Sequence, residues 1–248
     1  MRKKVKCLRL KVIEGKDTPL INGRDAKILL AFKSPYQLIE IVEWDPKSGK
    51  KALLLNGEVQ YIEGKPSEDY HNAHASLLNA CPENTKRIAI IGGGDGILAG
   101  KLAKKYPHSE IYVFELDPCM VYVFSKYERK VNHDAFNQPN VKVVIGDAFK
   151  TIRKFPKGFF DAMFIDLPDG FPDKWDLYDP EKLSILIDRL KVGGCTSIYT
   201  GGIPSKDFIH DNLPRCLKVI RTNRIVGMFG GYGEVIHAKK VSSRCHTR

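Results

Sequence analysis

The feature that most constrains this sequence is a run of glycines that interrupts an apolar segment. Residues 88–91 read Ile-Ala-Ile-Ile, which is typical of a buried β-strand. Residues 92–96 then read Gly-Gly-Gly-Asp-Gly, and the apolar spacing after them predicts a helix over 97–105. Glycine at a strand-to-helix turn allows backbone conformations and a close approach of a ligand that a Cβ atom would block. We therefore expect Gly92 and Gly94 to line a binding site in an open α/β sheet.

An acidic residue follows the end of each of four predicted strands. Asp95 lies in the glycine turn, Glu115 ends the strand 110–115, Asp147 follows 141–145, and Asp166 follows 160–165. Because parallel strands place their carboxyl ends at one edge of the sheet, we expect these acids to gather along that edge. A single acid after a strand is usually a helix cap, but four in register favour a shared site. A carboxylate at Glu115 can accept hydrogen bonds from both hydroxyls of a ribose.

The composition predicts a folded protein without a membrane-spanning or exported segment. Of the 248 residues, 43% are hydrophobic, which is enough to build a full core. No apolar run approaches the roughly 18 residues that cross a bilayer, and no apolar signal core follows the basic N-terminus. The cysteines are scattered and lack metal-type pairing; they are Cys7, Cys81, Cys119, Cys195, Cys216 and Cys245. We therefore expect a cytoplasmic protein with reduced thiols, no disulfide framework and no metal site.

The formal net charge of +11 raises the question of nucleic-acid binding. Much of the positive charge lies near the two ends of the chain, within 2–11 and 239–248. The sequence lacks an arginine-rich stripe interleaved with aromatic residues, which proteins that bind single strands carry. Solvated basic faces are the better interpretation, and we do not expect a nucleic-acid partner.

Residues 1–64 are expected to form a small antiparallel β domain. Partial alternation of apolar residues predicts strands at 28–32, 36–44, 51–55 and 58–61. Asn56 and Gly57 form a dipeptide that favours a two-residue hairpin turn. An open edge of this sheet is suited to self-association, so we expect a homodimer or homotetramer formed through it.

Residues 65–248 are expected to form a Rossmann-like domain that starts with a helix over 68–80, capped by Ser67. Strands and helices then alternate, which calls for parallel strands with right-handed crossovers. The expected strands are 85–91, 110–115, 141–145, 160–165 and 194–200. The expected helices between and after them are 97–105, 118–130, 148–154, 179–190 and 205–214. Two strand-like segments, at 217–223 and 234–238, are expected to close the sheet. His71 and His74 share a face of the first helix. Packing or substrate contact is a better interpretation for them than metal ligation, because no third ligand is near.

Five motifs follow one another along the chain. They are Ser-Pro-Tyr-Gln at 34–37, Asn-Gly-Glu-Val-Gln at 56–60, Tyr70 with His71, Gly-Gly-Gly-Asp-Gly at 92–96, and Asp-Leu-Pro-Asp at 166–169. This series resembles the polyamine aminopropyltransferases, the family of the spermidine synthases, over about residues 34–200. The resemblance implies an α/β fold with a small N-terminal antiparallel β domain, followed by a Rossmann-like, methyltransferase-type doubly wound sheet.

The resemblance also implies the transfer of an aminopropyl group from decarboxylated S-adenosylmethionine to a putrescine-like di- or polyamine. The nucleoside would be a co-substrate, and no cofactor would be bound permanently. The residues implied to hold the nucleoside are Gln37, His71, Gly92, Gly94, Asp95, Glu115 on the ribose, Asp147 on the adenine amino group, and Ala148. Asp166 would accept the proton, and the amine would be held by Tyr70, Asp166, Asp169 and Tyr232.

These residue types suit that chemistry. A protonated alkylammonium has no lone pair, so a carboxylate beside it must accept a proton as the nitrogen attacks the carbon next to the sulfonium. Asp95 would attract the bare ammonium of the decarboxylated donor and repel the carboxylate of intact S-adenosylmethionine. Asp169 can anchor the far ammonium of the amine. The alternative is that Asp166 and Asp169 only cap the next helix.

The chain departs from the family pattern in several places. Asn56 stands where the family has aspartate, Asn72 where it has glutamate and Gly170 where it has proline, and the family's Tyr-Pro-Ser-Gly segment is reduced to Tyr-Gly-Glu from Tyr232. Two other functions therefore stay open. One is a methyltransferase that uses intact S-adenosylmethionine on the same fold. The other is a non-catalytic relative that binds a nucleoside, a polyamine or RNA.

Overall fold

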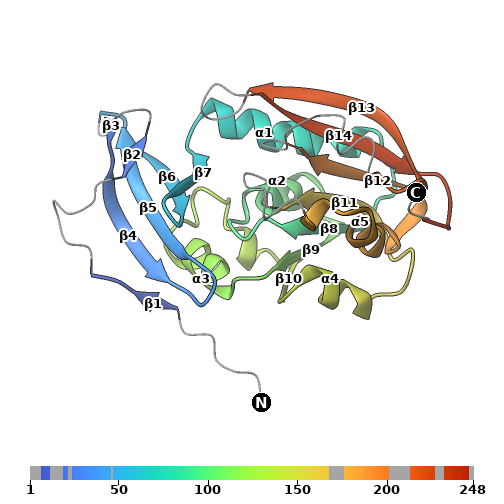
Figure 1. The fold of residues 1–248 in the computed structure, drawn as a ribbon, viewed down its shortest axis with the longest axis horizontal. Helices are drawn as coiled ribbons and strands as arrows, with labels where there is room; N and C mark the ends of the chain where they lie inside the picture. Colours follow the sequence, from blue (N-terminus) through green and yellow to red (C-terminus); the bar gives the residue numbers. More distant parts are fainter. Residues whose placement is uncertain are drawn as a thin grey trace, which may run out of the picture.

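The computed structural model describes residues 7–11, 19–21, 24–45, 47–167, 176–200, 213–226 and 232–245. Figure 1 shows two β-sheets side by side, a smaller one from the N-terminal part of the chain and a larger one flanked by helices. The predicted fold class is confirmed, since a small antiparallel sheet precedes a mostly parallel, Rossmann-like sheet. Within the described ranges, no helix has the length and apolar character needed to cross a membrane.

The smaller sheet has the strand order β1-β4-β5-β6-β7, and every neighbouring pair is antiparallel. Its strands are β1 (Leu8–Arg9), β4 (Lys27–Lys33), β5 (Leu38–Asp45), β6 (Lys50–Leu55) and β7 (Glu58–Ile62), while β2 (Leu20–Ile21) pairs separately with β3 (Arg24–Asp25). The predicted hairpin turn is confirmed at Asn56 and Gly57, whose φ angles of 53° and 83° fit a type I′ turn.

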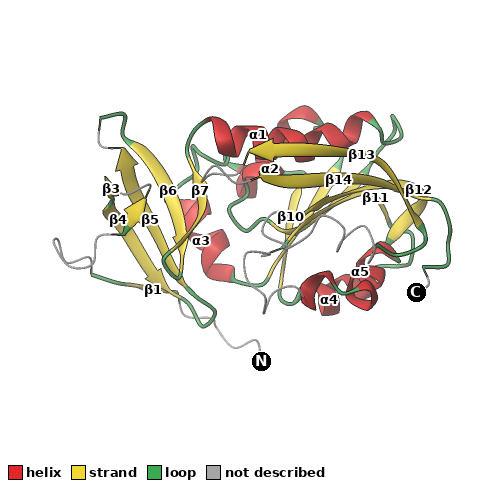
Figure 2. Cartoon of the chain, turned by 45° about the horizontal axis from the view of Figure 1, so that its top comes forward, coloured by secondary structure: helices red, strands yellow, loops and turns green. Residues whose placement is uncertain are grey.

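The larger sheet has the strand order β10-β9-β8-β11-β12-β14-β13. Its parallel strands are β8 (Arg87–Gly92), β9 (Glu110–Glu115), β10 (Val141–Ile145), β11 (Phe160–Asp166) and β12 (Leu190–Tyr199), and its antiparallel strands are β13 (Leu217–Val226) and β14 (Tyr232–Lys240). Figure 2 shows α1 (Lys65–Ala75) and α2 (Ile97–Lys105) on one face, with α4 (Ala148–Thr151) and α5 (Pro180–Ile187) on the other. Both faces are covered, which explains why the four central residues of β8 are all apolar: Ile88 and Ile90 pack in one core, Ala89 and Ile91 in the other.

Helix α3 (Pro118–Lys126) connects the two sheets. Its buried Met120, Val123 and Phe124 pack in one apolar cluster with Phe32 of β4. Because α3 follows β9 directly, this cluster holds the smaller sheet beside the edge where the parallel strands of the larger sheet end. That edge is where the sequence predicts the site.

Most predicted elements are confirmed, and the differences lie at their ends. Helix α1 begins three residues earlier than predicted, because Pro66 fits the first turn, where a missing N–H costs nothing. The prediction that Ser67 caps this helix is wrong: Ser67 lies inside it, and its hydroxyl accepts a hydrogen bond from the amide of Ile62 at 3.2 Å. Helix α3 ends at Lys126, before the predicted end. The helix predicted over 205–214 falls mostly outside the described residues.

The prediction of reduced thiols is wrong for four of the six cysteines. Cys7 forms a disulfide with Cys119, and Cys216 forms one with Cys245, across Cα–Cα distances of 5.3 and 4.8 Å. The other two cysteines are free. The bonded partners are 112 and 29 residues apart in sequence, so the fold alone brings them together.

Candidate functional site

At two positions of the 92–96 turn, atoms of neighbouring strands leave no room for a Cβ atom. Gly92 has a φ of 87°, and a Cβ atom there would lie 2.1 Å from the backbone oxygen of Asp166 on the adjoining strand β11. A Cβ atom at Gly94 would lie 2.5 Å from Oε2 of Glu115. Gly92 therefore permits the pairing of β8 with β11, and Gly94 leaves room for the Glu115 side chain.

The four predicted acids lie at the carboxyl ends of neighbouring parallel strands. Their spatial order along the edge is Asp147 after β10, Glu115 at the end of β9, Asp95 after β8 and Asp166 at the end of β11. The amide of Gly146 donates to the carbonyl oxygen of Glu115 at 2.8 Å, which fixes the loop that carries Asp147 beside β9. The structure thus brings together the acids that are far apart in sequence.

Three of these acids share one local geometry. Asp95, Glu115 and Asp147 each accept a hydrogen bond from the backbone amide two residues further on, at 2.9, 2.7 and 2.9 Å. For Asp147 this contact caps α4, whose first residue is Ala148, and Nζ of Lys150 lies 3.5 Å from its second oxygen. The helix-cap interpretation therefore describes Asp147 in part, whereas neither Asp95 nor Glu115 is the N-cap residue of a helix.

Burial gives three of the carboxyl groups raised pKa values. The pKa of Asp95 rises to about 6 because the surrounding protein shields this half-buried group from water. Burial, together with the charge of Asp95, raises the pKa of Asp166 to about 6 against the opposing hydrogen bond from Tyr70. Burial, followed by the charges of Asp117 and Asp95, raises the pKa of Glu115 to about 7. Within the described part of the chain, none of the three forms an ion pair with a lysine or arginine, so a cationic ligand would stabilise their charged forms.

Tyr70 and His71 of α1 reach the same edge. The hydroxyl of Tyr70 donates a hydrogen bond to Oδ1 of Asp166. Nδ1 of the buried His71 lies 2.6 Å from the carbonyl oxygen of Ser67, and burial lowers the pKa of His71 to about 4, so its ring is neutral near pH 7. The ring of Tyr70 packs edge-on against that of Tyr199 at the end of β12, with centroids 4.9 Å apart. No motif pointed to Tyr199, which the sequence analysis missed.

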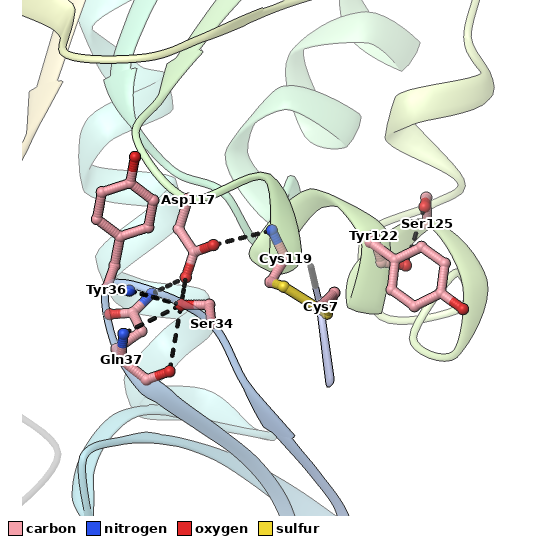
Figure 3. Close-up of a disulfide and its surroundings, with 8 residues drawn as sticks. All are labelled: Cys7, Ser34, Tyr36, Gln37, Asp117, Cys119, Tyr122 and Ser125. Atoms are coloured by element: carbon pink, nitrogen blue, oxygen red, sulfur yellow. Dashed lines mark hydrogen bonds between the residues drawn. A yellow bond between two sulfur atoms is a disulfide. The ribbon is translucent and has the colours of Figure 1, made fainter. Parts of the chain in front are cut away.

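Asp117 is a second residue that the sequence analysis missed. Figure 3 shows it between the turn that joins β4 to β5 and the start of α3. Its Oδ2 accepts hydrogen bonds from Oγ of Ser34 at 2.7 Å and from Nε2 of Gln37 at 3.0 Å, and its Oδ1 accepts from the amide of Cys119 at 2.9 Å. Its own amide donates to Glu115. One buried carboxylate therefore links the predicted ligands Gln37 and Glu115.

The amine half of the predicted site is described less fully. Asp169 lies outside the described residues. Tyr232 begins β14, and its side chain is also outside the description. His74 is buried, with Nδ1 2.8 Å from Oγ of Ser197, and the described residues contain no group of three or more metal-ligating side chains. The geometry therefore covers the predicted nucleoside half of the site more completely than the predicted amine half.

Comparison with known proteins identifies relatives of this chain. Residues 68–219 match the family model described as the spermine/spermidine synthase domain. The chain is similar to a polyamine aminopropyltransferase of Corynebacterium efficiens, with 34% identity over 171 residues that cover 67% of this chain and 31% of the relative. It is also similar to the spermidine synthase of Schizosaccharomyces pombe, with 31% identity over 169 residues that cover 68% of this chain and 55% of the relative. The chain thus spans between about a third and about half of the length of these curated relatives.

Solved structures show the same fold. The spermidine synthase of Thermotoga maritima superposes with a TM-score of 0.71 at 23% identity, over 88% of this chain and 74% of that one. A spermidine synthase in complex with the transition-state analogue AdoDATO also gives a TM-score of 0.71 at 23% identity, over 89% and 75%. The family model covers 68–219, which is more than half of the 248 residues. This chain therefore belongs to the spermine/spermidine synthase family.

Proposed function

We propose that this protein transfers the aminopropyl group of decarboxylated S-adenosylmethionine to an amine and releases methylthioadenosine. The observation that carries the proposal is the set of half-buried carboxyl groups of Asp95, Glu115 and Asp166, whose pKa values are raised and which have no cationic partner among the described residues. Both substrates are cations, and their charges would compensate carboxylates that are costly to bury alone. Membership of the spermine/spermidine synthase family supports the same reaction.

Asp166 is the proposed proton acceptor. The amine nitrogen attacks the carbon beside the sulfonium, the new carbon–nitrogen bond forms, and the carbon–sulfur bond breaks with its electron pair moving to sulfur. The proton lost by the attacking amine goes to Asp166, whose raised pKa of about 6 suits a base that works near neutral pH. The hydrogen bond from Tyr70 orients this carboxylate. Asp169 and Tyr232 are proposed to hold the rest of the amine.

The other acids are proposed to hold the donor. Glu115 accepts hydrogen bonds from the ribose hydroxyls, and Asp147 accepts one from the adenine amino group. Asp95 lies beside the propylammonium, and Gln37 and His71 complete the contacts with the nucleoside. The donor is a co-substrate in this scheme, without a permanently bound cofactor.

The domain division and the assembly are proposed as well. We divide the chain into a β domain at 1–64 and a nucleoside-binding domain at 65–248, with self-association as a homodimer or homotetramer through the former. A cytoplasmic location stays a prediction.

The choice of donor tests the proposed function. Titration calorimetry should show that decarboxylated S-adenosylmethionine binds more than about tenfold more tightly than intact S-adenosylmethionine, which corresponds to about 1.4 kcal/mol. The reason is that Asp95 attracts the bare ammonium and repels the carboxylate. The variant Asp95→Asn should lose most of this preference. Equal affinities in the wild-type protein, or a preference for the intact compound, would contradict the proposal and favour a methyltransferase.

A further inference from the structure

Two links, one covalent and one hydrogen-bonded, join the smaller sheet to the first turn of α3 (Figure 3). Cys7 precedes β1, and the antiparallel register of β1 with β4 places Cys7 opposite Ser34. Cys7 is bonded to Cys119, the second residue of α3, while Oγ of Ser34 donates to Asp117, which caps that helix. The disulfide and the hydrogen bond are therefore neighbours that hold the same two elements.

The contacts of Asp117 lead from this disulfide to the proposed nucleoside site. The amide of Cys119 donates to Asp117 at 2.9 Å, and the amide of Asp117 donates to Oε1 of Glu115 at 2.7 Å. On the other side, the amide of Gln37 donates to Oγ of Ser34 at 3.0 Å, and Nε2 of Gln37 donates to Asp117 at 3.0 Å. A shift of α3 relative to the smaller sheet would disturb all of these hydrogen bonds together.

Without the disulfide, β1 is weakly attached. It has two residues, both with exposed side chains, and it lies at the edge of the smaller sheet. The disulfide joins it to a segment 112 residues further along the chain. Reduction would free the segment before β1 from α3, and the smaller sheet would then be held to α3 by the apolar cluster around Phe32 and by the hydrogen bonds of Asp117.

We propose that Cys7–Cys119 is a reversible redox site: the oxidised form fixes Gln37 and Glu115 in place, and the reduced form loosens them. Its effect on nucleoside binding rests on the proposed function. Reduction occurs by exchange with a dithiol, whose first thiolate attacks the sulfur of Cys7, the half-buried residue of the pair, and displaces the fully buried Cys119 as a thiolate. The second thiolate of the reductant attacks the mixed disulfide and releases Cys7. The dithiol is thereby oxidised to a disulfide. The protein disulfide takes up two electrons and two protons and becomes two thiols.

The second disulfide provides a matched control. Cys216 precedes β13 and Cys245 follows β14, at the opposite end of the larger sheet's strand order from β10. Both pack on the apolar core that contains Tyr178 and Leu190. The variant Cys245→Ser removes this bond and leaves Cys7–Cys119 intact.

Amide hydrogen exchange of the full chain, followed by mass spectrometry, tests the redox site directly. Peptides that cover 34–38 and 117–120 should exchange roughly fivefold faster after treatment with dithiothreitol, because the amides of Gln37 and Cys119 lose their fixed acceptors. The variant Cys7→Ser should show the fast exchange without reductant, and Cys245→Ser should match the oxidised wild type. Equal exchange in the oxidised and reduced protein, or failure of oxidised glutathione to re-form the bond in peptide maps, would overturn the proposal.

Calorimetry with methylthioadenosine then tests the link to function. Reduction, or Cys7→Ser, should weaken binding about tenfold, and Cys245→Ser should leave it within twofold. If exchange responds to reduction but neither form binds methylthioadenosine, the proposed function fails and the redox site stands. If both forms bind it equally, the control of the nucleoside site is refuted.

Discussion

Replacement of Gly94 with alanine should weaken nucleoside binding while the sheet stays folded. Gly94 does not have a positive φ, so alanine suits its backbone, but the new Cβ atom would lie 2.5, 2.6 and 2.9 Å from Oε2, Cδ and Cγ of Glu115. The Glu115 carboxylate would have to move away from the amide of Asp117, which now donates to it at 2.7 Å. The substitution therefore displaces one side chain and leaves the backbone in place.

The magnitude follows from the hydrogen bonds that Glu115 is proposed to make with the ribose. Each hydrogen bond to an ionised acceptor contributes about 1.5 kcal/mol, so the loss of two costs about 3 kcal/mol. That corresponds to roughly a hundredfold increase in the Kd for methylthioadenosine. Titration calorimetry measures this change, and thermal unfolding measures the stability of the same sample.

Two further variants sharpen the test. The first is the double variant Gly94→Ala/Glu115→Asp, in which the shorter side chain at residue 115 relieves part of the clash with the new Cβ atom at residue 94. Its loss of affinity for methylthioadenosine should therefore be smaller than the sum of the losses in the two single variants. Gly92→Ala places its Cβ atom 2.1 Å from a backbone oxygen of β11 at a φ of 87°, so it should lower the melting temperature strongly. A Gly94→Ala protein that binds methylthioadenosine within threefold of wild type would refute the placement of Glu115 on the ribose.

Three other predictions concern the carboxyl groups of the site. Asp166→Asn should lower kcat about a hundredfold or more and leave nucleoside affinity within about twofold; steady-state kinetics showing turnover within a few-fold of wild type would place the base elsewhere. Because burial raises the pKa of Glu115 from 4.5 to about 7, the folded protein binds this proton more tightly than the unfolded chain does. The free energy of unfolding should therefore fall as the pH rises from about 4.5 to 7, and denaturant titrations of Glu115→Gln should show a shallower fall. Asp117→Asn presents an N–H₂ group to Ser34 and Gln37, so calorimetry should show methylthioadenosine binding weakened roughly five- to tenfold, by about 1 kcal/mol; unchanged binding would remove Asp117 from the site.

Local signals were sufficient for the central part of the fold. The ends of α2, β9 and β10 coincide with the predicted residues 97–105, 110–115 and 141–145, because the apolar periodicity of each is bounded by a glycine or a proline close to its ends. The helix α1 had two competing signals within three residues, and the proline at its first turn overrode the serine that could have capped it. The acids were predictable as a group, since every parallel strand contributes its own carboxyl end to one edge.

Long-range contacts were not predictable from the same signals. Ser34 and Gln37 meet Asp117 across 83 and 80 residues, and Cys7 meets Cys119 across 112. These pairs depend on how α3 packs against the smaller sheet, and no local pattern encodes that packing. Tyr199 reaches Tyr70 for a similar reason, because β12 and α1 are brought together only when the sheet is complete.

Product analysis tests the proposed reaction most directly. The protein is incubated with decarboxylated S-adenosylmethionine and a panel of putrescine-like di- and polyamines, and chromatography with mass spectrometry follows both products. The account predicts that methylthioadenosine and one aminopropylated amine form in equal amounts, and that Asp166→Asn suppresses both. Transfer of a methyl group from intact S-adenosylmethionine, or nucleoside binding without any product across the panel, would contradict it.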